Sequence, residues 1–221
     1  SEICERMGIW LHVDAAYAGP AAALPEKREE FEGWERADTI VLNPHKWMST
    51  PIDCSILLFR DAAAMRRPLA LTPEYLRSDE DGSNLMDIGL SLGRRFRALK
   101  LWFQFRMEGA EGLRERLRRH IALAGELAGW IEADARFEVL APHPFSLVVF
   151  RAVPPGGADP DEWNRRLLEA VNRDGRVFLS HTAVGGRFAL RLAVGSARGT
   201  EASVIEAWHI LKDQYDRMAA D

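Results

Sequence analysis

Two residues with complementary chemistry, Asp14 and Lys46, each follow a short hydrophobic run of the chain. The aspartate lies in the string HVDAAY and the lysine in the string NPHKW. A lysine amine can form a Schiff base with an aldehyde, and a carboxylate can keep a pyridine nitrogen protonated. Pyridoxal phosphate (PLP) chemistry needs both groups, so this pair predicts a PLP site.

Three hydrophobic runs are expected to be the strands that position these groups. They cover residues 9–13, 39–43 and 55–59. Nearly continuous apolar runs are typical of strands in a sheet that is covered on both faces. Polar residues gather where the first two runs end, and open α/β sheets bind ligands at that carboxyl edge.

Residues 1–8 read as the last two turns of an amphipathic helix that ends at the C-cap glycine Gly8. A buried strand directly after such a helix end would lack neighbours at the start of a domain. We therefore expect the chain to be the C-terminal part of a longer protein.

Two helical patterns, at residues 93–106 and 111–133, are separated by Gly109 and Gly112. We place a domain boundary there, which divides the chain into residues 1–110 and 111–221. The second part is expected to be a small α+β domain. Its expected strands are residues 137–140, 146–151, 177–180 and 188–194, and its expected helices are residues 159–173 and 200–218.

The composition indicates a soluble protein. Of the 221 residues, 47% are hydrophobic, and the formal net charge is −4 with no obviously basic face, which argues against nucleic-acid or membrane-surface partners. Cys4 and Cys54 have no metal-ligand or CxxC spacing, so we expect reduced thiols, no metal site and a cytoplasmic protein.

Five strings give the chain a family resemblance: HVDAAYAG, NPHKW, DCS, LGRRFRALK and LRLAVGS. The chain resembles the group II PLP-dependent decarboxylases, most closely the aromatic-L-amino-acid decarboxylases. The similarity runs through essentially the whole chain but covers only the C-terminal half of a typical member. It implies a fold-type-I α/β architecture, in which residues 1–110 are the C-terminal part of a large, mainly parallel-sheet, PLP-binding domain. It also implies a homodimer with sites at the interface, or a companion chain that supplies the N-terminal half.

The resemblance assigns roles to the two opening residues. Lys46 would form the Schiff base, and Asp14 would pair with the pyridinium nitrogen. Each residue has a simpler alternative, because most lysines lie at the surface and aspartate often caps a helix after a strand. A lysine between His45 and Trp47 is a poor surface lysine, and desolvation there would favour the neutral amine that imine formation requires.

Four further residues are assigned to the cofactor by resemblance. Ala16 would lie beneath the ring, while Asn43, His45 and Thr39 would surround the phosphate. Polar side chains at strand ends suit a phosphate, although each could equally be an ordinary structural residue.

Tyr75, within a polar segment at about residues 71–84, matches the family's catalytic-loop tyrosine. A phenol on a closing loop could protonate the quinonoid carbon after carbon dioxide leaves. The alternative is an exposed tyrosine on a solvated loop. Family members with phenylalanine at this position tend to form aldehydes, so tyrosine favours simple decarboxylation.

Four arginines could bind a substrate carboxylate or could form buried ion pairs that tie the two domains together. They are Arg94, Arg95, Arg97 and Arg191.

The sequence thus predicts PLP-dependent decarboxylation of an L-amino acid, expected to be aromatic, through a Lys46 aldimine. One alternative is a non-catalytic truncated or split-chain partner, and another is an aromatic aldehyde synthase on the same scaffold. No GxSxG, HExxH, P-loop or GxGxxG string offers a second catalytic system.

Overall fold

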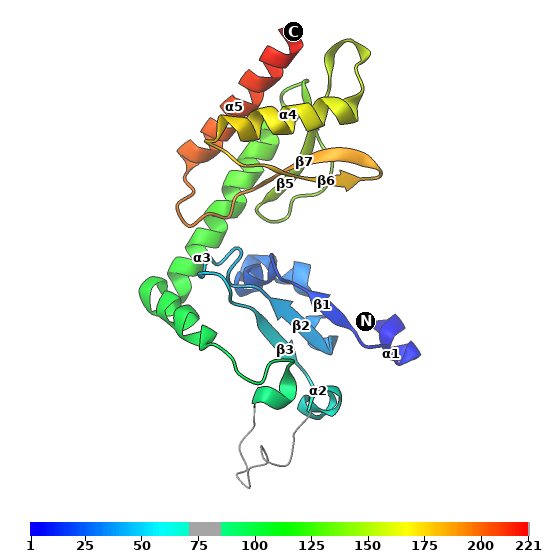
Figure 1. Cartoon of the computed structure of the whole chain (residues 1–221), viewed down its shortest axis with the longest axis vertical. Coiled ribbons are helices and arrows are strands. Elements are labelled where there is room, and N and C mark those ends of the chain that lie inside the picture. The colour runs from blue at the N-terminus through cyan, green and yellow to red at the C-terminus, as the bar shows by residue number, and fades with distance from the viewer. Residues whose placement is uncertain (71–84, 221) are drawn as a thin grey trace. The chain divides into compact units, whose positions relative to one another are not determined.

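The computed structural model describes residues 1–70 and 85–220, which divide into two compact units (Figure 1). The first unit is Ser1–Ala110 and the second is Glu111–Asp221. The division falls where Gly109 and Gly112 suggested a boundary in the sequence. The assignment of these units to a PLP-binding domain and a small domain remains a prediction.

The first unit contains a three-stranded sheet in the order β1-β2-β3. Strands β1 and β2 are parallel, with His12 opposite Thr39, whereas β2 and β3 are antiparallel. The helices and strands of this unit are α1 (Glu2–Met7), β1 (His12–Asp14), β2 (Thr39–Leu42), β3 (Ile56–Phe59) and α2 (Ala62–Leu69), together with short 3-10 helices at Gly19–Ala23, Pro25–Phe31, Trp34–Arg36 and Leu85–Ile88.

The expected strand at residues 9–13 is wrong in its start, since β1 begins only at His12. The cause lies at Leu11, whose N–H donates to Asp38 Oδ2 at 2.7 Å instead of to a neighbouring strand. The expected helix end is confirmed, because α1 ends at Gly8 with φ 63° and the Ile9 N–H donates to the Cys4 carbonyl oxygen at 2.8 Å.

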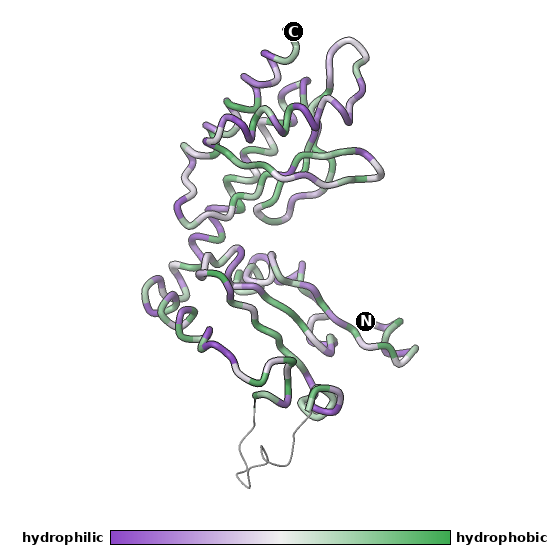
Figure 2. The backbone as a smooth tube through the Cα atoms, viewed as in Figure 1, coloured by the Kyte–Doolittle hydropathy of each residue, from purple (hydrophilic) through white to green (hydrophobic). Residues whose placement is uncertain are grey.

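The expectation that this sheet is covered on both faces does not hold within the described chain. Figure 2 shows hydrophobic residues along β2 and β3, yet Leu57 and Leu58 of β3 are 42% and 51% exposed. The large, fully buried side chains of this unit, among its described residues, are Trp47 and Leu24. A sheet with so little covering it leaves its apolar side chains in contact with water.

The second unit begins within α3 (Arg97–Glu132), whose backbone leaves the helical region at Gly109, with φ 71° and ψ 170°. Its sheet has the order β4-β5-β7-β6, and all its neighbouring strands are antiparallel. The remaining elements are β4 (Phe137–Val139), β5 (Leu147–Ala152), α4 (Pro160–Asp174), β6 (Ser180–Val184), β7 (Arg187–Ala193) and α5 (Glu201–Ala220), with a 3-10 turn at Pro155–Gly157.

The expected strand at residues 177–180 is wrong, because β6 begins at Ser180 and runs to Val184. The N–H and carbonyl of Leu179 are bound by the side chain of Asn172 in α4, so this segment is held by a helix and not by a strand. The strand then turns into β7 through Gly185 and Gly186, whose φ angles of 57° and 79° fit a tight two-residue hairpin.

A single core joins the helices and sheet of the second unit. Its fully buried large side chains come from α3, β5, α4, β7 and α5, and they include Leu127, Ile131, Phe150, Leu167, Leu190 and Leu211. Among the helices in the described ranges, none is long and apolar enough to cross a membrane.

Candidate active site

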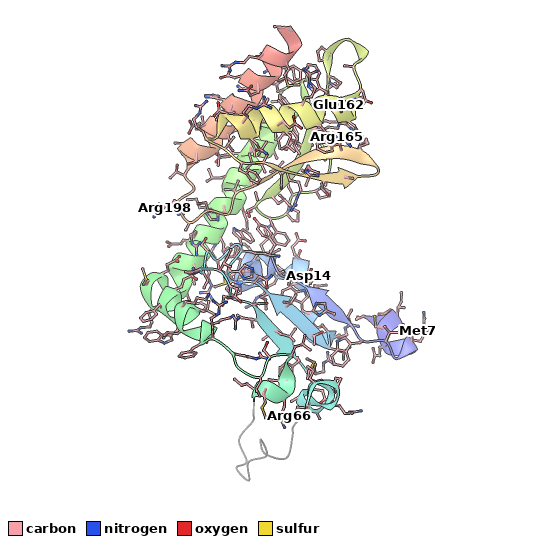
Figure 3. The ribbon with its side chains drawn as sticks, in the orientation of Figure 1. Met7, Asp14, Arg66, Glu162, Arg165 and Arg198 are labelled. Atoms are coloured by element: carbon pink, nitrogen blue, oxygen red, sulfur yellow. The ribbon has the colours of Figure 1, made fainter. Side chains whose placement is uncertain are left out.

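Asp14 lies at the carboxyl end of β1 (Figure 3), where its side chain is exposed. Its Oδ1 accepts a hydrogen bond from the Ala16 N–H at 3.0 Å. The aspartate therefore caps the turn that follows the strand. The simpler interpretation, that it caps a helix, is wrong, because the next helix, Gly19–Ala23, has no side-chain cap. The bond from the Ala16 N–H occupies one carboxylate oxygen, and Oδ2 makes no hydrogen bond within residues 1–70 and 85–220, so it remains open to a ligand.

The parallel pairing of β1 and β2 continues past the strand ends and brings Ala16 beside Asn43. The Ala15 N–H donates to the Val41 carbonyl at 3.0 Å, and the Asn43 N–H donates to the Ala16 carbonyl at 3.1 Å. The small side chain of Ala16 is buried. The carboxylate of the first motif and the start of the second therefore share one sheet edge, as the strand pattern predicted.

Lys46 lies in a compact turn that we call the lysine loop, residues 43–50. The Lys46 N–H donates to the Asn43 carbonyl at 2.9 Å, the Ser49 N–H donates to the Lys46 carbonyl at 3.0 Å, and the Thr50 N–H donates to the Pro44 carbonyl at 3.0 Å. Ser49 has the left-handed φ of 62°, which lets the chain reverse so tightly.

The expected desolvation of Lys46 is not found within the described chain. Its side chain is exposed, and its Nζ forms no hydrogen bond or ion pair with residues 1–70 or 85–220. The neighbouring Trp47 takes the buried position instead, with no exposed surface. The turn thus directs the indole into the unit and the amine outward.

His45 and Asn43 are both fixed by the segment that precedes β3. His45 Nδ1 lies 2.6 Å from the Cys54 carbonyl oxygen and 3.1 Å from the Cys54 nitrogen, so the ring nitrogen open to a ligand is Nε2. Ser55 Oγ donates to Asn43 Oδ1 at 2.6 Å. This bond orients the Asn43 amide and leaves its Nδ2 donor available for an acceptor such as a phosphate oxygen.

Thr39 does not join this group. It stands at the first residue of β2, about 13 Å along an extended strand from Asn43. Its hydroxyl accepts a hydrogen bond from Trp10 Nε1 at 2.9 Å and lies 2.8 Å from His12 Nδ1. The structure therefore gives Thr39 a buried structural position at the opposite end of the strand, and its predicted contact with the cofactor phosphate finds no support there.

Two of the predicted arginines meet at Asp53. Arg95 donates to Asp53 Oδ1 and Arg97 Nε donates to Asp53 Oδ2, each at 2.8 Å. The hydrogen bond from Arg97 is the main reason why the pKa of Asp53 is held below its usual range. These pairs are partly exposed and lie within the first unit, so the expectation of buried ion pairs between the two domains is wrong for both arginines.

Tyr75, the predicted proton donor, falls in residues 71–84 and lies outside the described residues. Its role stays a prediction.

Sequence reasoning missed several residues that hold the two motifs. Tyr17 stacks on Trp47, and Gln104 of α3 reaches the lysine loop. Cys54 and Ser55 hold His45 and Asn43, and their only signal in the sequence was the string DCS, which supported the family resemblance without a stated role.

The residues at this edge fit the chemical groups of PLP. Asp14 offers an open carboxylate oxygen for a pyridinium nitrogen, and Ala16 offers a small surface for a ring. Asn43 and His45 offer polar groups for a phosphate, and Lys46 offers an exposed amine for an aldehyde. Metal chemistry has no comparable donor set, since no group of three or more potential ligands occurs among the described residues.

An α/β sheet whose carboxyl edge carries a lysine loop beside an aspartate offers the groups that a PLP site needs. The sequence agrees, since residues 1–153 match the family described as the pyridoxal-dependent decarboxylase conserved domain. The chain belongs to this family, which confirms the predicted family and cofactor.

Similar proteins support the same assignment. Tryptophan decarboxylase 1 of Oryza sativa subsp. japonica is 42% identical over 222 residues, which cover 96% of this chain and 43% of that protein. Phenylacetaldehyde synthase of Arabidopsis thaliana is 42% identical over 219 residues, which cover 96% of this chain and 45% of that protein. The structure of Oryza sativa TDC with PLP and tryptamine matches with a TM-score of 0.92 at 41% identity, and covers 99% of this chain and 46% of that one. The predicted fold class is confirmed, and the chain spans less than half the length of these relatives.

Proposed function

We propose that this chain takes part in the PLP-dependent decarboxylation of an aromatic L-amino acid, with PLP attached at Lys46. The observation that carries this proposal is the meeting of Asp14, Ala16, Asn43 and the lysine loop at one sheet edge, in a member of the pyridoxal-dependent decarboxylase family. The aromatic substrate class is supported by the similarity to a tryptophan decarboxylase.

PLP, when bound, supplies an electron sink for the bond to the substrate carboxylate. The residues of this chain hold and tune it. Lys46 Nζ would attach the aldehyde, and Asp14 Oδ2 would stabilise the proton of the ring nitrogen, because an anion close to a cation favours the charged form. Asn43 Nδ2 and His45 Nε2 would hold the phosphate. Tyr75 is the proposed proton donor to the substrate carbon.

The second candidate is an aldehyde-forming reaction on the same scaffold, favoured by the similarity to phenylacetaldehyde synthase. The tyrosine at position 75 favours simple decarboxylation. Product analysis with L-tryptophan, L-tyrosine, L-phenylalanine and L-DOPA separates the two reactions. Amine and carbon dioxide support the decarboxylase, whereas aldehyde and hydrogen peroxide would overturn it.

A partner polypeptide is part of the proposal, because the start of α3 exposes several large apolar side chains. Those that are at least two-fifths exposed are Leu99, Trp102, Phe103, Phe105 and Met107. A group of large exposed apolar side chains is typical of a surface that another polypeptide covers. We propose that a homodimer partner, or a companion chain that carries the remaining part of the relatives' length, covers this helix. Light scattering coupled to size-exclusion chromatography tests the assembly.

A cytoplasmic location completes the proposal. It is supported by the two free cysteines, Cys4 and Cys54, since disulfides are rare in reducing compartments. Cell fractionation tests it.

The decisive experiment is attachment of PLP. Purified protein is incubated with PLP, the visible absorbance is recorded, and the adduct is reduced with borohydride and located by peptide mass spectrometry. The expected result is modification at Lys46 that Lys46→Ala abolishes, while the matched change Lys100→Ala leaves it intact. Wild-type protein that binds no PLP would support the alternative of a non-catalytic partner.

A further inference from the structure

The first part of α3 contacts the lysine loop through the side chain of Gln104. Its Nε2 donates to the carbonyl oxygen of Met48, and the Thr50 hydroxyl donates to its Oε1. Thr50 is 2% exposed, so its hydroxyl is bound out of reach of water. A single amide thus holds both residues that flank Ser49, the left-handed residue of the loop.

The same helix reaches the other side of the loop through Arg97. Arg97 and Gln104 are seven residues apart and therefore lie on one face of the helix. Arg97 Nε binds Asp53 Oδ2 at 2.8 Å, and Asp53 directly precedes Cys54 and Ser55, which hold His45 and Asn43. One helix face therefore supports the part of the loop that follows Lys46 in the sequence. It also supports the segment that holds Asn43 and His45, which precede Lys46.

Support from other elements matters because the Lys46 side chain forms no hydrogen bond or ion pair with residues 1–70 or 85–220. The side chain is exposed, so the position of its amine depends on the backbone of the loop. That backbone is a series of turns without strand pairing. Besides hydrogen bonds within the loop, the N–H groups of Asn43 and His45 tie its first part to Ala16 and Cys54. Contacts from other elements therefore set the position of the loop relative to Asp14, and Gln104 supplies two of them, at Met48 and Thr50.

We infer that Gln104 is a positioning residue for Lys46, acting through Met48 and Thr50, and that Asp53 with Arg97 supports the same loop from its other side. This inference rests on the proposed attachment of PLP at Lys46. Gln104 acts by placing the amine where the aldehyde is held, and it contacts neither the cofactor nor the substrate in this role. Its loss lowers the rate of attachment without removing the amine that attaches.

The first test measures the loop in the protein without PLP. Amide hydrogen exchange is followed at Lys46, Ser49 and Thr50, whose N–H groups close the loop. Gln104→Leu removes both hydrogen bonds to the loop and is expected to raise these exchange rates about tenfold. The matched control is Arg106→Met, two residues along the helix, where the guanidinium lies over the Trp102 ring and away from the loop. Exchange that is the same in Gln104→Leu and wild type would overturn the inference.

The second test measures the rate at which Lys46 captures PLP, trapped by borohydride. Thr50→Val removes the hydroxyl at nearly constant volume and is expected to slow capture about tenfold, whereas Thr50→Ser keeps the hydroxyl and restores most of the rate. A purely structural role would let the isosteric valine match or exceed serine. The double variant Gln104→Leu with Thr50→Val is expected to be little slower than either single variant, because both remove the same contact.

These outcomes separate the inference from the proposed function. Wild-type protein that captures no PLP contradicts the attachment itself, and the exchange data then still report on the loop. If wild type, Thr50→Val and Gln104→Leu all capture PLP at the same rate, the positioning role is overturned. The proposed function is then unaffected. If Gln104→Leu does not fold, the comparison of Thr50→Val with Thr50→Ser still tests the positioning role, because it removes the same contact from the loop.

Discussion

The indole of Trp47 lies parallel to the phenol ring of Tyr17, with ring centroids 5.3 Å apart and 7° between the planes. Tyr17 follows the turn that Asp14 caps, and Trp47 follows Lys46 directly. The stack therefore joins the two motifs through their side chains, in addition to the backbone pairing of Ala16 with Asn43. It explains why an aromatic residue stands beside the carboxylate motif and another beside the lysine.

Removing this ring is expected to weaken the first unit strongly. Trp47 has no exposed surface, so Trp47→Ala leaves a large cavity and should lower the free energy of unfolding by about 3–5 kcal/mol. Urea denaturation measures the change. Trp102→Ala is the matched control, since that indole is 54% exposed and its loss should cost far less. Equal losses for the two variants would contradict a central role for the stack.

Gly19 is expected to tolerate no side chain, because the 3-10 helix Gly19–Ala23 packs closely on the end of β2. A Cβ at this position would lie 2.6 Å from Leu42 Cδ2 and 3.2 Å from Ala15 Cβ. Gly19→Ala should therefore lower the free energy of unfolding by about 1–3 kcal/mol. Gly125→Ala in α3 is the control, as a Cβ there meets nothing within 4 Å, and helix propensity predicts a gain of up to about 1 kcal/mol. A neutral result at Gly19 would mean that Leu42 moves aside freely.

Features set by local chemistry could be predicted from the sequence. The glycine that ends α1 and the break at Gly109 each follow from backbone conformations that glycine adopts easily, and both were expected at these positions. The position of Asp14 and Asn43 at one sheet edge followed from the rule that parallel strands share a carboxyl edge.

Features set by individual side-chain contacts in the folded chain could not be predicted. Leu179 looked like a strand residue because it is apolar, yet the amide of Asn172 binds its backbone. Lys46 looked buried because it stands between His45 and Trp47, yet the turn points it outward. Gln104 gave no signal at all, since a glutamine on a helix is ordinary until the fold places a loop beside it.

Asp134 is expected to stabilise the second unit in a pH-dependent way. The guanidinium of Arg136 binds both of its oxygens, at 2.9 and 2.6 Å, and this holds the pKa of the carboxyl below its ordinary value of 3.8. A lowered folded-state pKa gives stability that is complete above the ordinary value and is lost as the pH falls through the folded-state value. Asp134→Asn should therefore cost about 2 kcal/mol at pH 7 and progressively less below about pH 4.

Thermal unfolding of wild type and Asp134→Asn across this pH range measures that difference. Asp213→Asn is the control for removing one negative charge from the same unit, as Asp213 forms no ion pair with the described residues. If Asp134→Asn lowered the free energy of unfolding by the same amount from pH 7 to pH 3, the charge of Asp134 would not be the source of its stabilising effect.

His120 is expected to make the second unit less stable in mild acid. Its ring is fully buried in α3, and burial, together with the nearby charges of Arg116 and Arg119, lowers its pKa from 6.5 to about 4. The folded protein therefore binds fewer protons at this site than the unfolded chain between pH 6.5 and 4, so the free energy of unfolding falls as the pH drops through that range. The size of the pKa shift corresponds to a loss of about 3 kcal/mol.

The variant His120→Gln tests this expectation. It should be less stable than wild type at pH 7, because it changes a fully buried side chain. It should lose less stability on acidification, because glutamine cannot gain the proton. Urea denaturation at several pH values measures the slope, with His209→Gln, an exposed histidine of the same unit, as the control. If His120→Gln lost as much stability as wild type between pH 6.5 and 4, the buried imidazole would not be the group that responds to acid.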